Sequence, residues 1–493
     1  MSTTAGRLPM HRAPPALQAG VNWRRPLICA AFHFQHPHVL PELDLIAAIE
    51  RSPEKIDAVQ KRRLEELLFH AWEQTDYYRD VLERCGAVRK GRVHLERFED
   101  IPFLTKKIIR EQGARLRAKS LPDGRRAFAN RSSGTSGEPV HFWQDNVYWD
   151  VTIATRTYHF SMAGKNIGER EMKIWGSERD LYQGTIGLKA KLQNRIYNRR
   201  FEQCFHLPER SMRQIIAHIN DWKPKMLWCY RDGIYALAKY INQHGIMVHP
   251  PASVVLGGAT VYPFMAETIA RAFRAPVISA YGSREIGAAA CECGTGEGHH
   301  LAAQSHVVEA IDPDERPVME KEGELAITPL MNWAMPLIRY RIGDRGRLTS
   351  RRCSCGRAFP MLDALSGRIL EAMTNGKGDH VDGGFVVYVL AFMAERGYLR
   401  KFQVIQEEDG SITINVVPET ATSLIDHSSD VQFLTDKIQV VMGQDCPVRF
   451  QEVDDIPTNA SGKYPYVVNR RSGRQPESAP PLAAPHHARV LRA

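Results

Sequence analysis

The stretch NRSSGTSGEP at residues 130–139 combines small hydroxyl side chains with glycines. Glycine lets a backbone come close to a ligand, and successive N–H groups in a turn form a concavity that binds anions. The stretch therefore predicts a loop that holds phosphate, although alone it also fits an ordinary surface loop. The sequence has neither the Gly-Lys-Ser/Thr ending of a P-loop nor a G-x-S-x-G elbow. Ser133 and Ser136 are therefore not predicted to be acyl nucleophiles.

Four of the nine cysteines form two close pairs, in CECGTGEGHH at 291–300 and in CSCG at 353–356. Two Cys-x-Cys units, the first followed by histidines, fit a zinc site with four protein ligands. Such a site leaves no position open for water, so its role would be structural. Four free thiols that pair by chance are the alternative. The remaining cysteines are scattered singly and are expected to be small buried side chains.

The elements that must position these stretches follow a layered pattern. Residues 58–86 show helical periodicity, and a second short helix is expected to open at Pro102–Thr105. Between about 125 and 285, short apolar segments ending in glycine or serine alternate with helical stretches such as FMAETIARAF, which predicts an α/β core. The expected strands are HFSMAG, MKIWGS, MLWCY, SVVLGGA and PVISAYGS. Ligands usually collect at the ends of such strands.

After about residue 305 the pattern turns to strands: HVVEAI, GELAITPL, PLIRYRIGD and GRLTS. A break follows near 367–371, where we expect a hinge. Beyond it we expect a smaller unit with helix 384–396, strands KFQVIQ and SITINVV, helix 431–443 and strand VRFQEV. The predicted fold class is α/β, with a large layered N-terminal core joined by a hinge to a small α+β C-terminal domain. The predicted divisions are 1–41, 42–366, 367–470 and 471–493.

Six motifs in order carry a resemblance to a known family. They are the serine-glycine loop, VVLGGATV at 254–261, AYGSREIG at 280–287, RYRIGD at 339–344, SGR at 366–368 and PTNASGKYPY at 457–466. In this order they resemble the adenylate-forming (ANL) ligase superfamily, in its phenylacetate–CoA ligase-like, CapK-like and coenzyme F390 synthetase-like branch. The openings LLFHAWEQTDYYRDVL and IPFLTKKIIRE are similar to that branch as well. The resemblance runs from about 58 to 470.

The resemblance implies roles in ATP binding. Glu285 corresponds to the magnesium-binding glutamate, Tyr281 to an aromatic residue that stacks on adenine, and Asp344 to an aspartate that binds both ribose hydroxyls. A helix-start acid, a core tyrosine and a turn aspartate are the structural alternatives. The implied ATP-binding set also contains Ser132, Ser133, Gly134, Thr135, Ser136, Gly137, Gly258, Ala259, Gly282, Ser283, Arg284 and Arg368.

The resemblance also implies one catalytic cation. Lys463 corresponds to the lysine that swings in on the small domain and bridges the carboxylate and the α-phosphate, and a compact charge on a long stem suits that task. Two residues depart from the pattern of the family. Arg284 replaces the usual Thr or Ser at the α-phosphate, and Leu370 replaces the usual hinge Asp or Lys. For zinc, the resemblance favours Cys293, His300, Cys353 and Cys355, with Cys291 and His299 as substitutes.

The net charge of +9 comes mostly from the two ends of the chain. Residues 1–41 hold four arginines and no acid, and residues 467–493 hold five arginines and one glutamate, which gives +4 and 5 − 1 = +4. Both ends are rich in Pro, Ala and Ser, so 1–41 and 471–493 are predicted to be disordered basic tails. A nucleic-acid surface would need this charge on a folded face, so no nucleic-acid partner is expected.

The longest apolar run, FVVYVLAFM at 385–393, is too short to cross a bilayer, and the chain does not open with a charged-then-apolar leader. We expect a cytoplasmic protein without a membrane partner. The sequence is also compatible with a homodimer.

The resemblance implies an AMP-forming ligase that uses ATP and Mg²⁺, with structural Zn²⁺, to activate an aromatic or small carboxylic acid, with CoA as the expected acceptor. The alternative is an adenylating enzyme with another acceptor: an amine, a carrier-protein thiol or a hydroxyl. A non-catalytic relative kept for binding is the third reading. The acid would lie near Trp175–Arg179, Tyr230 and Gly257–Tyr262.

Overall fold

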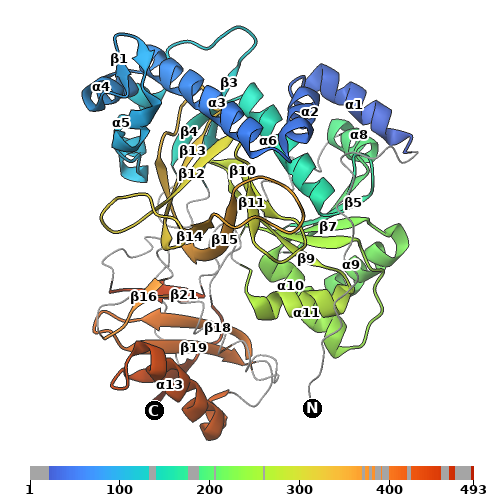
Figure 1. The fold of residues 1–493 in the computed structure, drawn as a ribbon. Coiled ribbons are helices and arrows are strands. Elements are labelled where there is room, and N and C mark those ends of the chain that lie inside the picture. The colour runs from blue at the N-terminus through green and yellow to red at the C-terminus, as the bar shows by residue number, and fades with distance from the viewer. Residues whose placement is uncertain are drawn as a thin grey trace.

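The computed structural model describes residues 22–132, 140–175, 188–204, 207–258, 261–368, 372–376, 380–382, 390, 399–418, 424–456, 466–471 and 490–492. Figure 1 shows a large N-terminal core, and beside it the C-terminal elements form a smaller unit, drawn in orange to red. The predicted fold class is therefore confirmed. No helix of the described residues is long and apolar enough to cross a membrane.

The centre of the core is one sheet with the strand order β12-β13-β14-β15-β11-β10-β9-β8-β7-β5-β6. In one half of this sheet, neighbouring strands in the series β9-β8-β7-β5-β6 run parallel to each other. The strands of that half are β5 (Glu171–Trp175), β6 (Arg199–Gln203), β7 (Met226–Tyr230), β8 (Ser253–Gly257) and β9 (Val277–Ser283).

Apolar side chains cover both faces of the parallel half, as a doubly covered sheet requires. On β8, Val254 and Leu256 face one cluster and Val255 faces the other. The first face is covered by α9 (Glu209–Trp222), α10 (Arg231–Gln243) and α11 (Pro263–Phe273). The second is covered by α1 (Arg24–Gln35), α2 (Val39–Ile49) and α6 (Asn146–Met162). Helix α8 (Leu188–Ile196) precedes β6.

The other half of the sheet is antiparallel. It contains β10 (Gly287–Glu292), β11 (His299–Leu301), β12 (His306–Ile311), β13 (Glu322–Pro329), β14 (Tyr340–Thr349) and β15 (Met361–Arg368). A cluster of buried side chains joins this half to α3 (Pro53–Gln74), α4 (Asp76–Cys85) and α5 (Lys106–Leu116). Small elements complete this part: β1 (Val88–Arg89), β2 (Arg92–Val93) and η1 (Leu95–Asp100).

A separate two-stranded sheet, β3 (Ala127–Arg131) and β4 (His141–Asp145), carries the serine-glycine stretch between its strands. The C-terminal unit is a sheet with the order β21-β18-β19-β20-β22 and the helix α13 (Ser428–Met442). Its strands are β18 (Leu399–Gln406), β19 (Ile412–Pro418), β20 (Val448–Glu452), β21 (Val467–Asn469) and β22 (Val490–Arg492). The short strands β16 (Ala372–Thr374) and β17 (His380–Asp382) pair with each other, β16 contacts β21, and η3 (Leu424–Asp426) contacts α13 and β20.

Most expected elements are found, and three expectations need correction. The segment HFSMAG is the end of α6 and not a strand, because Asp145 caps a helix that runs through it. The single predicted helix over 58–86 is two helices, because the Thr75 side chain accepts a hydrogen bond from the N–H of Tyr78 and starts α4. PLIRYRIGD and GRLTS contribute to one strand, β14.

The predicted disorder of 1–41 is wrong for residues 24–35 and 39–41. These residues form α1 and the start of α2, because Ile28, Phe32 and Val39 are buried against the core. Residues 490–492 of the predicted C-terminal tail form β22, which pairs with β20. The predicted helix 384–396 lies outside the described residues apart from Leu390, as does the hinge around Leu370.

Candidate active site and metal centre

The serine-glycine loop has a closed base. Ser132 is buried and its backbone N–H donates to the carbonyl of Val140 at 2.9 Å, while its hydroxyl accepts from the N–H of Val140, also at 2.9 Å. These two bonds bring the ends of the loop together at the tip of the β3–β4 hairpin. Ser133, Gly134, Thr135, Ser136 and Gly137 lie outside the described residues.

A buried glutamine connects this hairpin to the β9–β10 turn. Gln144 on β4 accepts a hydrogen bond of 2.9 Å from the side chain of Asn130 on β3. Its own amide donates at 2.7 Å to the carbonyl of Arg284. Gln144 is 1% exposed, so both contacts are shielded from water. The β3–β4 hairpin, from which the predicted phosphate loop extends, is thereby connected to the turn that carries the predicted magnesium ligand, Glu285.

The β9–β10 turn itself is tight. A Cβ on Gly282 would lie 2.1 Å from the carbonyl oxygen of Gly287, so only glycine fits at this position. The hydroxyl of Ser283 donates to the Glu285 carboxylate at 2.8 Å and accepts from the Glu285 N–H at 3.2 Å. Tyr148 on α6 donates to the Glu285 carbonyl at 3.2 Å, and burial raises the pKa of Tyr148, which keeps the phenol protonated. The turn therefore holds one carboxylate in a fixed place.

Two predicted nucleotide contacts meet directly. The hydroxyl of Tyr281 on β9 donates to the carboxylate of Asp344 on β14 at 2.8 Å. Asp344 also pairs in register with Arg368 on β15, next to irregularities in the β14–β15 ladder. Bulges of this kind are common beside active sites, where they re-aim a side chain. An aromatic ring, a carboxylate and the backbone of Arg368, which precedes the predicted hinge, are thus close together.

The turn after β8 is glycine-rich and lies beside aromatic rings. Gly258 has φ +88°, a left-handed conformation that favours glycine, while Ala259 lies outside the described residues. A Cβ on Gly257 would meet Trp175 and Trp228 at 3.6 Å. The ring centroids of Trp175 and Tyr230 are 5.7 Å apart. The structure thus brings together the three described parts of the predicted acid pocket, although Gly176–Arg179 lies outside the described residues.

The C-terminal unit contacts this same edge. Tyr466 packs on Tyr262, with ring centroids 6.3 Å apart, and the Arg231 guanidinium lies 5.0 Å from the centre of the Tyr466 ring. Arg231 directly follows β7, at the carboxyl ends of the parallel strands. Lys463, three residues before Tyr466, lies outside the described residues.

The predicted zinc ligands form a cluster. One ligand atom from each of Cys293, His300, Cys353 and Cys355 lies within 4.8 Å of the others. The Cys293 and Cys353 sulfurs are 3.5 Å apart, and the Cys355 sulfur lies 3.3 Å from Nε2 of His300. Three thiols and one imidazole are a common donor set for tetrahedral zinc. The four residues connect the β10–β11 segment to the loop between β14 and β15.

The two proposed substitutes do not belong to this cluster. Cys291 is fully buried in an apolar cluster, and burial raises the pKa of its thiol. His299 is buried as well, and both of its ring nitrogens lack a hydrogen-bond partner within the described part of the chain. On a strand, neighbouring side chains point to opposite faces, so His300 and His299 cannot serve the same site.

Sequence reasoning missed three residues that organise this edge: Gln144, Tyr148 and Arg231. Gln144 and Tyr148 act on backbone carbonyl groups, which leave no pattern in the sequence. Arg231 was detectable in principle, since it directly follows the strand MLWCY, whose end was expected to approach a ligand.

Comparisons with known proteins show which proteins this chain is similar to. A family model described as the CapK C-terminal domain matches residues 375–470. The phenylacetate-coenzyme A ligase of Thermus thermophilus is 26% identical over 381 residues, which cover 76% of this chain and 82% of that protein. Protein CapK of Staphylococcus aureus is 20% identical over 418 residues, or 83% and 88% of the two chains.

Among solved structures, 2-hydroxyisobutyryl-CoA ligase in the postadenylation state superimposes with a TM-score of 0.67. The match covers 87% of this chain and 93% of that chain at 18% identity, so it supports the fold: a large mixed core with a small C-terminal domain.

Proposed function

We propose that this chain, which belongs to the phenylacetate–CoA ligase and CapK-like branch of the adenylate-forming superfamily, activates a carboxylic acid with ATP and transfers the acyl group to CoA. A carboxylate oxygen attacks the α-phosphorus, the bond to pyrophosphate breaks, and an acyl-adenylate forms. The thiolate of CoA then attacks the acyl carbon and releases AMP. The observation that carries the proposal is the contact between Tyr281 and Asp344 beside the Glu285 turn.

The chemistry requires two anions to meet, so catalysis depends on neutralisation and alignment. Glu285 is the proposed ligand of Mg²⁺, which would neutralise phosphate charge. Asp344 would bind the ribose, and Tyr281 would place its ring against the adenine. Gly258 and the backbone after it offer close approach to the base. The loop from Ser132 to Gly137 would hold the leaving phosphates through N–H groups and hydroxyls.

Arg284 and Arg368 are proposed to contact the nucleotide as well. An arginine at position 284 can bind a phosphate through two parallel N–H groups, where a hydroxyl offers only one contact. Gln144 fixes the Arg284 backbone and acts as a positioning residue.

Lys463 is the proposed catalytic cation. Support comes from Tyr466, which packs on Tyr262 and Arg231 at the carboxyl ends of the core strands. Lys463 is only three residues before Tyr466 in sequence, so its long side chain can reach the same edge of the core. The boundary between the two domains is proposed to lie at 367–371, and the divisions 42–366 and 367–470 follow from it.

The acid is proposed to lie against Trp175 and Tyr230. The two rings meet edge to face, and Gly257 brings the backbone close to Trp175 and Trp228, so the surroundings are aromatic. Such surroundings suit an aromatic or otherwise small apolar acid, because flat rings pack on one another at low entropic cost.

We also propose that Cys293, His300, Cys353 and Cys355 hold one structural zinc ion. Their atoms are close enough to share a metal with Zn–S bonds near 2.3 Å. When bound, zinc would stabilise the fold by cross-linking the two segments, and it would take no part in the reaction. It would fix the loop after β14, the strand that carries Asp344.

A second candidate function has an observation of its own. The match to the CapK C-terminal domain covers residues 375–470, in the unit that would bring the acceptor, and Protein CapK is similar to 83% of this chain. This favours an adenylating enzyme with a different acceptor: an amine, a carrier-protein thiol or a hydroxyl. Arg284 and Leu370, which depart from the usual pattern, point the same way.

Exchange of labelled pyrophosphate into ATP, measured with a panel of acids, tests the proposal. We expect exchange that depends on one class of acid. Addition of CoA should then give a thioester, and adenylate formation without a thioester would favour the second candidate. No exchange with any acid, in a folded protein that binds ATP, would favour a non-catalytic relative.

A further inference from the structure

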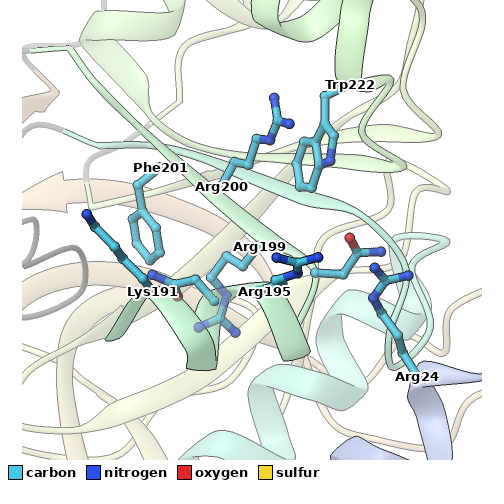
Figure 2. A pocket seen from close by; sticks show the side chains of 9 residues that line it. Arg24, Lys191, Arg195, Arg199, Arg200, Phe201 and Trp222 are labelled. Atoms are coloured by element: carbon cyan, nitrogen blue, oxygen red, sulfur yellow. The ribbon is translucent and has the colours of Figure 1, made fainter. Parts of the chain in front are cut away.

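A cavity of about 460 Å³ opens between α1, α8, β6 and the end of α9. Figure 2 shows cationic side chains from several elements lining it: Arg24, Lys191, Arg195, Arg199 and Arg200, with Trp222 beside them. Of the described residues that line the cavity, none is acidic. So many like charges around one space repel one another unless an anion lies among them.

One buried acid, at the start of β5, is already neutralised. Glu171 pairs with Lys165 at 2.8 Å and with Arg199 at 3.2 Å. Although burial alone would raise it, the pKa of Glu171 is lowered to about 2 by these cations. Burial, and to a smaller extent the nearby Arg199, lowers the pKa of Arg156 to about 10. Glu171 therefore cannot also balance Arg195, Arg200, Arg24 and Lys191.

Arg24 adds an independent observation. Its Nε atom is buried and has no hydrogen-bond partner in the part of the chain that the structure describes. A buried donor without an acceptor costs roughly 1–3 kcal/mol, so the guanidinium of Arg24, a residue that lines the cavity, is incompletely satisfied by the described protein groups.

The cavity lies apart from the candidate active site. Glu171 and Arg199 are the first residues of β5 and β6, and they pair in register. The cavity is therefore at the amino ends of the parallel strands. Tyr281 lies near the carboxyl end of β9, in the same parallel half of the sheet, so the two sites open at opposite edges.

We propose that this cavity binds a small soluble anion with two or three phosphate groups. One phosphate group carries a charge of about −1.5 to −2 at neutral pH, so a single group would leave most of the cations unbalanced. Arginine forks match phosphate oxygens in pairs. The cavity volume falls within the range of small-molecule sites. The Arg200 guanidinium lies 4.8 Å from the centre of the Trp222 ring, a pairing that also accepts a planar base.

Hydrogen–deuterium exchange of the full chain tests the site without any need for adenylation. The probes are inorganic phosphate, pyrophosphate and ADP. We expect pyrophosphate and ADP to slow exchange in the peptides of α8 and β6, at a concentration at least tenfold lower than phosphate requires. ADP bound at the active site would instead protect β9 and β14, so the two sites are read separately.

A charge reversal provides the matched comparison. Arg195→Glu should raise the half-saturating pyrophosphate concentration at α8 and β6 at least tenfold. Arg210→Glu, at an exposed arginine on α9 outside the cavity lining, should leave it unchanged. Neither variant should alter ATP–pyrophosphate exchange, so failure of this site and failure of the proposed ligase activity are distinguishable.

Three results would overturn the proposal. One is the lack of protection by either diphosphate, and another is protection that Arg195→Glu does not weaken. The third concerns lipid, because Trp23, which precedes α1, and Leu27 on α1 are large apolar side chains that are exposed, and Arg24 between them lines the cavity. Protection by vesicles that contain phosphatidylglycerol, with none from pyrophosphate or ADP, would assign the cations to a membrane headgroup.

Discussion

The hydroxyl of Tyr281 donates a 2.8 Å hydrogen bond to the carboxylate of Asp344, although β15, β11 and β10 separate their two strands in the sheet order. The sheet must therefore curve strongly enough to bring β9 and β14 face to face. That curvature builds the proposed nucleotide site from two segments that lie about sixty residues apart in sequence.

Removal of the Asp344 carboxylate should weaken ATP binding. Asp344→Ala loses charged hydrogen bonds worth about 1.5–3 kcal/mol, so we expect the KM for ATP to rise roughly ten- to hundredfold in ATP–pyrophosphate exchange. Tyr281→Phe keeps the ring and loses only the bond to Asp344, and should change this KM by no more than a few fold. Equal losses in both variants would contradict the separate roles.

Gln144 should matter to activity without touching the substrate. Gln144→Leu leaves the Arg284 carbonyl without its donor, which we expect to lower the free energy of unfolding by about 1–3 kcal/mol and to slow pyrophosphate exchange about tenfold. Urea denaturation and exchange kinetics measure the two effects. His141→Ala, at an exposed position on the same strand, is the control. Normal exchange by a destabilised Gln144→Leu protein would reduce Gln144 to a purely structural role.

Protein purified without added metal should contain close to one zinc per chain by elemental analysis. Cys353→Ser should lose most of this zinc and melt at a lower temperature, because the cluster connects β10–β11 to the loop after β14. Cys446→Ser removes a half-buried cysteine of the C-terminal unit and should keep the metal. Equal zinc in wild type and Cys353→Ser would exclude this site.

Acid should remove the contribution of Glu171 to stability. Its folded pKa of about 2 lies below the ordinary value of 4.5, so the ionised form is favoured by folding. That contribution, on the order of 3 kcal/mol, is complete above pH 4.5 and is lost as the pH falls towards 2. The difference in unfolding free energy between wild type and Glu171→Gln should therefore shrink by about 2 kcal/mol between pH 5 and pH 3, and further below pH 3. A constant difference across this range would be incompatible with the ion pairs to Lys165 and Arg199.

Parts of this structure with strong local signals could be predicted from sequence. The strand MLWCY is a short apolar run followed by Arg231, and the apolar run of SVVLGGA ends at two glycines. Thr105 caps the short helix that the sequence predicts after Pro102–Thr105. The metal cluster was predictable for a similar reason: Cys and His donors are few, and their pairs are close in sequence.

Other features depend on packing over long distances. HFSMAG has strand-like residues, but the helix that Asp145 starts continues through it and buries Phe160 and Met162. The composition of residues 22–41 is typical of a disordered tail and does not predict α1. The helix forms because Ile28 and Phe32 are buried against apolar side chains of the core. The cationic cavity gathers residues from α1, α8 and β6, and no local pattern shows that they meet.

The central claim is that this chain joins a carboxylic acid to AMP. Its most direct measurement is the fate of ATP labelled at the α-phosphate, in a single turnover with the acid that supports exchange. We predict acid-dependent formation of an acyl-adenylate, with pyrophosphate as the other product, and its loss in Lys463→Ala while ATP still binds. Cleavage of ATP to ADP and phosphate would contradict the account, as would ATP turnover that depends neither on the acid nor on Lys463.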